Sequence, residues 1–294
     1  MVCIGKMAVH TQTRRALSIS IVSRPYGPAH ADLRDERKGS NVDIKKEIIE
    51  IAKNARQAAG VLSRLSADVK NRALKHMADE LVRHTDYLLA ENGKDTEHAA
   101  SSGLPAAMID RLTLKKETVE SIARGLVEVA GLPDPVGKVT SMWRRPNGLL
   151  VGRMQIPLGV IGIIYESRPN VTADAAALCL KSGNAVILRG GSAAIPSTVA
   201  IAKILQDVLR KLDMPVAAIQ VTPATEREAV YEMLQLEEYI DLIIPRGGED
   251  LIRAVVNQSK IPVIKHYKGN CHIFVDADAD LDMAYDICLN AKVQ

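Results

Sequence analysis

Aromatic side chains are scarce in this sequence of 294 residues, at 3% of the total, with a single Trp and a single Phe. The interior therefore has to be filled by Ile, Leu, Val and Ala, which suits helices packed on a parallel sheet. No apolar run reaches the roughly 18 residues needed to cross a bilayer. With 47% hydrophobic residues, the sequence predicts a soluble, cytoplasmic protein with one large core or two medium ones.

Cysteine is also rare, with four residues spread along the chain: Cys3, Cys179, Cys271 and Cys288. No CxxC pair is present, which argues against a zinc site, and so few thiols argue against a disulfide scaffold. We therefore expect no metal. None of the four resembles an activated nucleophile, and the apolar surroundings of Cys179 favour a place in the core.

Acidic residues are absent before Asp32, so residues 1–41 carry a net charge of +4 and the rest of the chain about −1. The body has no basic excess that would attract nucleic acid. Residues 1–41 show neither helical nor strand periodicity. An organellar transit peptide is one interpretation of this segment, and a disordered or mis-started extension is the one that we favour.

From residue 42 onward the periodicity is helical. Apolar residues from Ile44 to Leu62 fall on one helical face, and a second helix is expected from Ala67 to the stop signal Asn92-Gly93. Two shorter helices are expected over 105–112 and 115–130. Residues 43–131 thus predict a helical layer, followed by a hairpin at about 136–154 around Pro146-Asn147-Gly148.

After Pro157 short apolar runs alternate with longer helical patterns. The expected strands are Gly159–Tyr165, Ala185–Arg189, Ile219–Val221, Leu242–Ile244 and Ile273–Val275. The expected helices lie at about 171–182, 194–212, 226–235, 249–258 and 280–292. This alternation predicts an α/β fold with a Rossmann-type parallel sheet covered on both faces. Ligands of such sheets bind beyond the carboxyl ends of the strands.

Two of the expected strands end in similar junctions that lead into a helix. Arg189-Gly190-Gly191-Ser192 follows one, and Arg246-Gly247-Gly248 follows another. Glycines let the backbone approach a ligand closely, and the N–H groups at a helix N-terminus bind anions. An ordinary glycine turn remains an alternative for each junction. Together the two junctions predict that a nucleotide diphosphate is held at both ends, although the GxGxxG fingerprint is absent.

The strand that ends at Tyr165 is followed by Glu-Ser-Arg168-Pro169-Asn170. Asn170 is either a helix N-cap or an amide that stabilises a developing oxyanion. Arg168 precedes Pro169 and is expected to be extended. Its guanidinium either binds an anionic substrate or lies at the surface.

Three blocks carry a family resemblance: RMQIPLGVIGIIYESRPN ending at Asn170, SGNAVILRGGS ending at Ser192, and YIDLIIPRGG ending at Gly248. In these blocks the chain resembles the gamma-glutamyl phosphate reductase family, part of the aldehyde dehydrogenase-like superfamily, from about residue 43 to the end. The resemblance implies an NADP-binding domain over 42–294, and a hairpin used for homo-oligomerisation. The catalytic domain is expected to be largely absent.

The resemblance also implies roles for residues. Asn170 matches the amide that stabilises the oxyanion, and Gly247 and Gly248 match the turn that faces the pyrophosphate. Arg189 matches a Lys that binds the adenosine ribose, and Ser192 stands where NAD-preferring members often carry Glu, which favours NADP. His266 falls where many aldehyde dehydrogenases carry a general base.

The implied reaction is the NADPH-dependent reduction of L-glutamyl 5-phosphate to L-glutamate 5-semialdehyde with release of phosphate, in proline biosynthesis. A cysteine thiolate attacks the acyl phosphate, and hydride then reduces the thioester. The resemblance places this Cys just beyond Gln294, so the chain alone is expected to be inactive. Two alternatives stay open: a non-catalytic relative that binds NADP or forms oligomers, and an ordinary aldehyde dehydrogenase acting on another acyl group.

Overall fold

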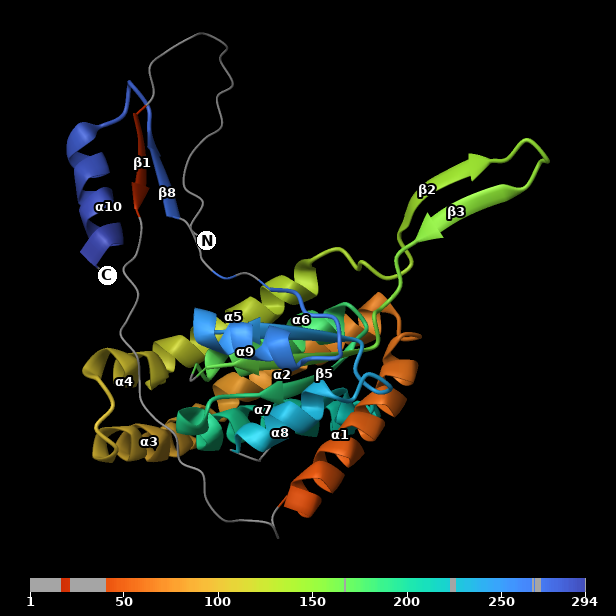
Figure 1. Cartoon of the computed structure of the whole chain (residues 1–294), viewed down its shortest axis with the longest axis horizontal. Helices are drawn as coiled ribbons and strands as arrows, with labels where there is room; N and C mark the ends of the chain where they lie inside the picture. The colour runs from red at the N-terminus through yellow and green to blue at the C-terminus, as the bar shows by residue number, and fades with distance from the viewer. Residues whose placement is uncertain are drawn as a thin grey trace. The chain divides into compact units, whose positions relative to one another are not determined.

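The structure is a computed structural model that describes residues 17–21, 41–166, 168–222, 226–265, 267 and 271–293. It consists of two compact units (Figure 1). The larger unit spans Glu36–Tyr267. The smaller one combines Met1–Asp35 with Lys268–Gln294.

A four-stranded parallel sheet forms the centre of the larger unit, in the order β6-β5-β4-β7. Its strands are β4 (Val160–Tyr165), β5 (Ala185–Arg189), β6 (Ile219–Val221) and β7 (Leu242–Arg246). Every residue of β4 is buried, because this aliphatic strand lies inside the sheet with both faces covered. The predicted parallel α/β sheet is confirmed.

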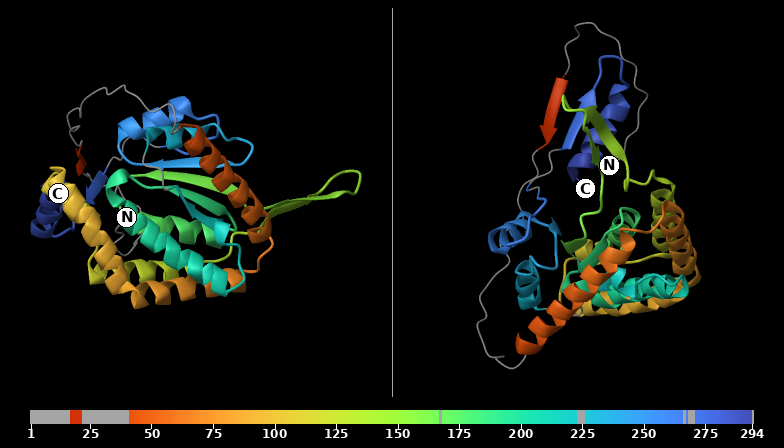
Figure 2. Two further views of the ribbon diagram at one scale, coloured as in Figure 1. Left: turned by 90° about the horizontal axis from the view of Figure 1, so that it is seen from below. Right: turned by 90° about the vertical axis from the view of Figure 1, so that its right-hand side faces the viewer.

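Helices cover both faces of the sheet (Figure 2). α6 (Asn170–Lys181) and α7 (Ile195–Lys211) connect β4 to β5 to β6 on one face. α8 (Arg227–Leu234) then leads the chain from β6 back across the sheet to β7. Connections between parallel strands are right-handed, and this one crosses the sheet in the opposite direction, so α8 lies on the other face. There it packs against α1 (Asn41–Leu62), which also contacts β4, β5 and β6. α9 (Glu249–Gln258) follows β7 and contacts α8.

The remaining helices form an outer layer over α6 and α7. They are α2 (Ala67–Arg83), α3 (Thr85–Ser101), α4 (Ala106–Leu112) and α5 (Lys116–Gly131). A layer of N-terminal helices was expected, but α1 does not belong to it, since α1 lies against the opposite face of the sheet.

The expected helix stop at Asn92-Gly93 is wrong. The chain breaks instead at His84, and α3 runs through both residues to Ser101. The buried Asn92 side chain donates to Leu112 O at 2.9 Å and accepts from Leu114 N at 2.7 Å. Asn92 therefore holds the loop before α5 in place, and this tertiary role overrides its local preference for a helix end.

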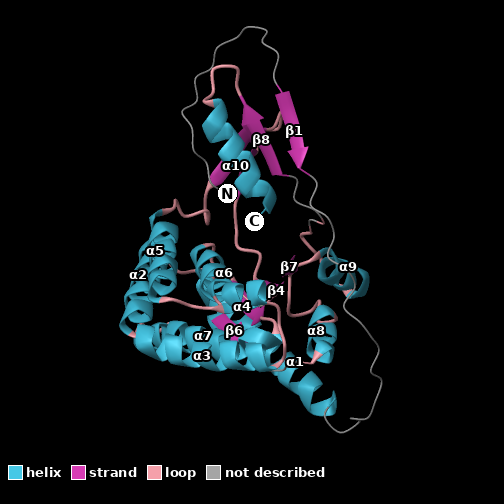
Figure 3. Ribbon diagram, turned by 90° about the vertical axis from the view of Figure 1, so that its left-hand side faces the viewer, coloured by secondary structure: helices cyan, strands magenta, loops and turns pink. Residues whose placement is uncertain are grey.

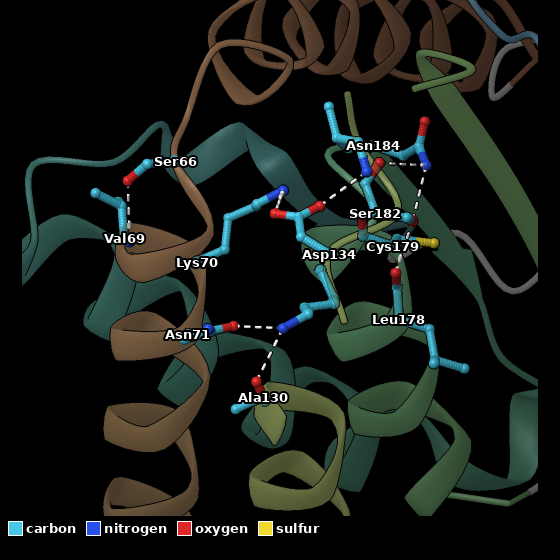
Figure 4. A network of polar contacts seen from close by, with 12 residues as sticks. Ser66, Val69, Lys70, Asn71, Ala130, Asp134, Leu178, Cys179, Ser182 and Asn184 are labelled. Carbon is cyan, nitrogen blue, oxygen red and sulfur yellow. Dashed lines mark hydrogen bonds and ion pairs between the residues drawn. The ribbon is translucent and has the colours of Figure 1, made fainter. Parts of the chain in front are cut away.

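A buried polar network ties α2 and α6 to the segment after α5 (Figure 4). Lys70 Nζ lies 2.6 Å from Asp134 Oδ2. Lys181 Nζ donates to Asn71 Oδ1 at 2.6 Å and to Ala130 O at 2.8 Å. Burial lowers the pKa of Lys181, and the Asp134 carboxylate opposes this shift. The network fixes the point from which the chain leaves for the hairpin.

The hairpin is formed by β2 (Val139–Arg144) and β3 (Leu150–Met154), which pair antiparallel as expected. Every residue of β2 is exposed. The exposed apolar side chains of the hairpin and the segment after it are Val139, Met142, Trp143, Leu149, Leu150, Met154, Ile156 and Leu158. Such a surface is typical of a protein contact.

The smaller unit contains β1 (Leu17–Ile21), β8 (Cys271–Val275) and α10 (Leu281–Val293), which Figure 3 shows by secondary structure. β1 and β8 pair antiparallel. Two expectations are therefore wrong: residues 1–41 do contain a strand, and Ile273–Val275 does not join the parallel sheet. The apolar-polar alternation of Leu-Ser-Ile-Ser-Ile is the signal that was available for β1.

By length and composition alone, the stretch Ser192–Lys211 resembles a membrane-spanning helix. In the structure it comprises a short 3-10 turn, η1 (Ser192–Ala194), and α7. α7 packs against β6, α2, α3 and α6, and its residues Ile201, Leu205 and Leu209 are fully buried. Its apolar character is therefore that of a core helix.

Candidate functional site

Both arginine-glycine-glycine junctions lie at the carboxyl edge of the sheet, on either side of β4. Arg189 at the end of β5 is in register with Ile164, and Arg246 at the end of β7 is in register with Tyr165. Two strand spacings, about 10 Å, therefore separate the junctions. The chain runs from β4 towards β6 in one direction and towards β7 in the other, so the crevice between β4 and β7 is the topological switch point, where ligands of such sheets bind.

Arg189 is half-buried at the first junction. Its Nη1 donates to Gly190 O at 3.1 Å. Burial lowers the pKa of the guanidinium, and the negative charge of Glu226 opposes this shift. The positive charge is thus partly desolvated, a setting that strengthens its attraction for an anion. Ser192, two residues beyond Gly190, is exposed.

Gly190 is closely packed by the chain itself. A Cβ at this position would lie 3.3 Å from Thr198 Oγ1 and equally close to the ring and hydroxyl of Tyr165. Tyr165, the last residue of β4, is fully buried, and its hydroxyl lies 2.8 Å from Thr172 Oγ1. Burial raises the pKa of Tyr165. The neutral phenol ties the end of β4 to the first turn of α6 and forms a rigid floor under the junction.

The helix expected after Arg189-Gly190-Gly191-Ser192 is present as α7, and the short 3-10 turn η1 precedes it. Pro196 at the start of α7 has no N–H. The next amide, that of Ser197, donates to the buried Asp95 Oδ2 at 2.9 Å, and the Ser197 hydroxyl bonds to the same oxygen. Asp95 therefore caps α7 from within the protein. The amide of Ser197, in the first turn of α7, is therefore used within the protein.

The second junction is closed by a carboxylate of the chain. Gly248 N–H donates to Glu166 Oε1 at 2.8 Å. A Cβ on Gly247 would lie 2.7 Å from that same oxygen and 2.7 Å from Leu251 Cδ2. Arg246 is exposed, and α9 begins at Glu249. Glu166 thus occupies a main-chain donor of the turn that was predicted to face a pyrophosphate.

Sequence analysis did not single out Glu166. It directly follows β4, and its own N–H donates to Arg246 O at 3.2 Å. Its position, one residue past a strand that borders the switch point, is the sequence feature by which Glu166 could have been predicted as a site residue. Glu166 is exposed, so the contact with Gly248 is accessible from solvent.

Asn170 is the first residue of α6, and Pro169 holds the capping position without a side-chain hydrogen bond. The N-cap alternative for Asn170 is therefore wrong. Its Nδ2 donates to Asp174 Oδ2 at 3.4 Å, one turn along the helix. Arg168 is exposed, and its backbone N–H donates to Glu166 O at 2.7 Å. Asp174 is a second residue that sequence analysis did not single out.

The structure describes the side chains of two free cysteines, Cys179 and Cys288. Cys179 is buried in α6, and burial raises its pKa to about 12. Cys288 lies on α10 in the smaller unit. Among the described residues no group of three His, Cys, Asp or Glu side chains is arranged for a metal ion. His266 and the Cys271 side chain, on which two of the expectations fell, lie outside the described residues.

Comparison with known proteins gives the same family throughout. The model of the aldehyde dehydrogenase family matches residues 40–294. Proteins named gamma-glutamyl phosphate reductase from Geobacter metallireducens and Geotalea daltonii are 61% and 60% identical over 251 residues. Each match covers 85% of this chain and 60% of the relative, so the chain spans about 60% of the length of these relatives.

Solved structures agree. The crystal structure of gamma-glutamyl phosphate reductase from Thermotoga maritima is 42% identical with a TM-score of 0.78, covering 84% of this chain and 60% of that one. The enzyme of the same name from Saccharomyces cerevisiae is 36% identical with a TM-score of 0.69, covering 83% and 62%. A probable aldehyde dehydrogenase from Listeria monocytogenes is 15% identical with a TM-score of 0.63, over 78% of this chain and 47% of that one, and shows the shared fold alone.

Proposed function

The chain belongs to the aldehyde dehydrogenase family, and from that premise we propose that its protein is a gamma-glutamyl phosphate reductase. The proposed reaction reduces L-glutamyl 5-phosphate with NADPH to L-glutamate 5-semialdehyde and inorganic phosphate, a step of proline biosynthesis in the cytoplasm. The observation that carries the proposal is the 61% identity over 251 residues to a protein of that name. Because the chain spans about 60% of that relative, the activity is proposed for the protein as a whole.

The switch-point crevice supports binding of NADPH. We propose that the Arg189 guanidinium and the Ser192 hydroxyl, just after β5, bind the adenosine ribose and its 2′-phosphate. An Arg–phosphate pair is charge-assisted and often bidentate, and Ser192 brings no negative charge that would repel the phosphate. NADP(H) is therefore the proposed cofactor. Arg246 is the candidate for charge compensation at the other junction.

The turn at Gly247-Gly248 is the proposed pyrophosphate site. Gly247 leaves no room for a side chain, and the amide of Gly248 points at an acceptor, as Glu166 Oε1 demonstrates by accepting from it at 2.8 Å. The donor set therefore fits a phosphate oxygen, provided that the Glu166 carboxylate moves away. When bound, NADPH supplies a hydride to the acyl carbon of the substrate.

For the acyl group, we propose that Asn170 Nδ2 donates to the carbonyl oxygen as it gains negative charge. A donor of this kind typically contributes about 10²–10³-fold in rate. Arg168 is the candidate that binds an anionic group of the substrate, either the phosphate or the α-carboxylate. The nucleophile is a cysteine, and Cys179 is not it, because a buried thiol with a pKa of about 12 is protonated at neutral pH.

The exposed hairpin β2-β3 is the proposed oligomerisation element. The exposed apolar residues of this two-stranded hairpin, among them Trp143 and Met142, would be buried by contact with another copy of the protein. A homo-oligomer is the expected assembly.

The test is the reverse reaction of the protein with L-glutamate 5-semialdehyde, NADP and inorganic phosphate. NADPH should form only when phosphate is present. Formation without phosphate would contradict the proposal and indicate an ordinary aldehyde dehydrogenase, since hydrolysis then replaces phosphorolysis. NADPH binding without any turnover would favour a non-catalytic relative, the second candidate.

A further inference from the structure

Asp174 lies on the accessible stripe of α6, one turn after Asn170. Most of this helix is buried; its buried residues are Thr172, Ala173, Ala175, Ala176, Ala177, Cys179, Leu180 and Lys181. Asp174 and Leu178 are exposed, and Asn170 is half-buried. The spacing of four residues places these three side chains on one face, so the accessible stripe of α6 begins at the proposed oxyanion donor.

Among the described residues, no cation forms an ion pair with the Asp174 carboxylate. It accepts from Asn170 Nδ2 at 3.4 Å. On the side of α5 its neighbour is Gly125, where an added Cβ would lie 3.8 Å from Asp174 Oδ1. Because Gly125 has no side chain, no side chain from this position of α5 covers the carboxylate oxygen. Although the residue is exposed, partial desolvation of its carboxyl raises the pKa of Asp174, and the hydrogen bond from Asn170 opposes this shift, whereas no cation of the described residues contributes.

The distance between Asn170 and Asp174 suits a γ-acyl group of an α-amino acid. The amide of Asn170 has two N–H groups, so one can donate to Asp174 while the other donates to a carbonyl oxygen. In a glutamyl group three C–C bonds and one C–N bond of about 1.5 Å each separate the acyl carbon from the ammonium, a span of about 5 Å. An acyl carbon held by the Asn170 amide therefore brings its ammonium within reach of the carboxylate beside that amide.

We propose that Asp174 binds the α-ammonium of the substrate and thereby selects acyl groups of α-amino acids over the corresponding deamino acyl groups. This inference rests on the proposed reductase function and adds a specificity-determining residue to it. Asp174 also fixes the orientation of the Asn170 amide, so that recognition of the ammonium and placement of the acyl oxygen are joined through one hydrogen bond.

The test compares two small probes on the full chain by calorimetry. One is L-glutamate 5-methyl ester, which carries the ammonium. The other is glutarate monomethyl ester, which lacks it. The wild-type chain should bind the amino ester about tenfold or more tightly than the deamino ester, since a charge-assisted hydrogen bond is worth at least this factor.

Asp174→Asn is the decisive variant, because it keeps an oxygen acceptor for Asn170 and removes the negative charge. It should bind both esters with equal, weak affinity. Asp110→Asn removes an exposed carboxylate from another helix, α4, and should keep the wild-type preference. Thermal unfolding of each variant checks that the fold is intact.

The proposal is overturned if the wild-type chain binds both esters equally or neither, or if Asp174→Asn keeps the preference. An NADPH titration of the same samples distinguishes failure of the Asp174 proposal from failure of the proposed function. Binding of NADPH without discrimination between the esters refutes the role of Asp174 alone. Failure of a folded chain to bind NADPH refutes the proposed function.

Discussion

The Glu166 carboxylate accepts a hydrogen bond from the backbone N–H of Gly248 at 2.8 Å, across the switch point of the sheet. Glu166 follows β4, and Gly248 immediately precedes α9. A negative charge near a helix N-terminus is stabilised by the helix dipole, so the position of the Glu166 carboxylate is electrostatically favourable. The same donor is the one that a pyrophosphate would use, so the carboxylate and the cofactor compete for it.

Glu166→Gln should therefore tighten NADPH binding. The variant removes a negative charge that has to be displaced and that repels the pyrophosphate. We expect a gain of roughly twofold to fivefold, since a factor of ten equals about 1.4 kcal/mol and exposed charges contribute up to about 1 kcal/mol. Isothermal titration with NADPH measures it.

Asp250→Asn is the matched control, because Asp250 lies in the first turn of the same helix. It removes an equal charge without the contact to Gly248. Its gain should be smaller than that of Glu166→Gln. Equal gains would mean that the charge of the region matters and the specific contact does not, and weaker binding by Glu166→Gln would contradict the competition directly.

Arg189→Ala should weaken binding of NADPH more than binding of NADH. The guanidinium is proposed to pair with the 2′-phosphate, and a charge-assisted pair of about 1.5–3 kcal/mol corresponds to a loss of at least tenfold. NADH has no such phosphate and should lose little. Fluorescence titration with each cofactor gives the two dissociation constants. Equal losses for both would refute the assignment of the 2′-phosphate to Arg189.

Asp95 makes the stability of the protein depend on pH. Burial raises the pKa of its carboxyl, although the hydrogen bonds from Ser197 act in the opposite direction. A folded-state pKa above the unfolded value of about 3.9 means that folding favours the protonated form. The contribution of Asp95 to the free energy of unfolding therefore falls as the pH rises from the unfolded pKa through the folded one.

Asp95→Asn lacks this titration and keeps an acceptor for Ser197. Its free energy of unfolding, relative to that of the wild type, should increase as the pH rises above the unfolded carboxyl pKa of about 3.9 and should level off above the folded-state pKa, as measured by urea denaturation. Asp95→Ala leaves the buried Ser197 donors without their acceptor and should cost about 1–3 kcal/mol. A difference between Asp95→Asn and the wild type that stays constant from about pH 3 upward would show that the carboxyl pKa is not raised.

Two glycines should respond to alanine in opposite directions. Gly93 lies inside α3, and an added Cβ meets nothing within 4 Å, so Gly93→Ala should stabilise the protein by about 0.5–1 kcal/mol. Gly183 has a φ of +74°, and its Cβ would lie 2.8 Å from Pro157 Cγ. Gly183→Ala should destabilise it by at least about 1–2 kcal/mol. Urea denaturation compares them, and similar signs would contradict the backbone description.

Much of the fold follows from local patterns in the sequence. β4 and β5 are aliphatic runs followed by helical periodicity, and both are where the sequence predicts them. The stop at Asn92-Gly93 misleads because the Asn92 side chain is used for contacts with Leu112 and Leu114, which spacing along the chain does not reveal. The pairing of β1 with β8 joins opposite ends of the sequence and is invisible to any local window.

The candidate site is predictable to a similar degree. The glycine junctions can be recognised because each follows a strand and precedes a helix or turn. The partners of these junctions cannot, since Glu166 reaches Gly248 and Asp95 reaches Ser197 only through the tertiary fold. The position of Asp174, four residues after Asn170, indicates that the two side chains lie on one helical face. The sequence does not show that Gly125 of the neighbouring helix α5 lies beside the Asp174 carboxylate.

The most direct test of the account is an NADPH titration of the folded 294-residue chain, followed by thermal unfolding and calorimetry. The crevice between β4 and β7 should bind NADPH more tightly than NADH. At a concentration of 100 times the dissociation constant, NADPH should raise the free energy of unfolding by about 2.7 kcal/mol. A cooperatively folded chain whose unfolding is unchanged by NADPH would contradict the account.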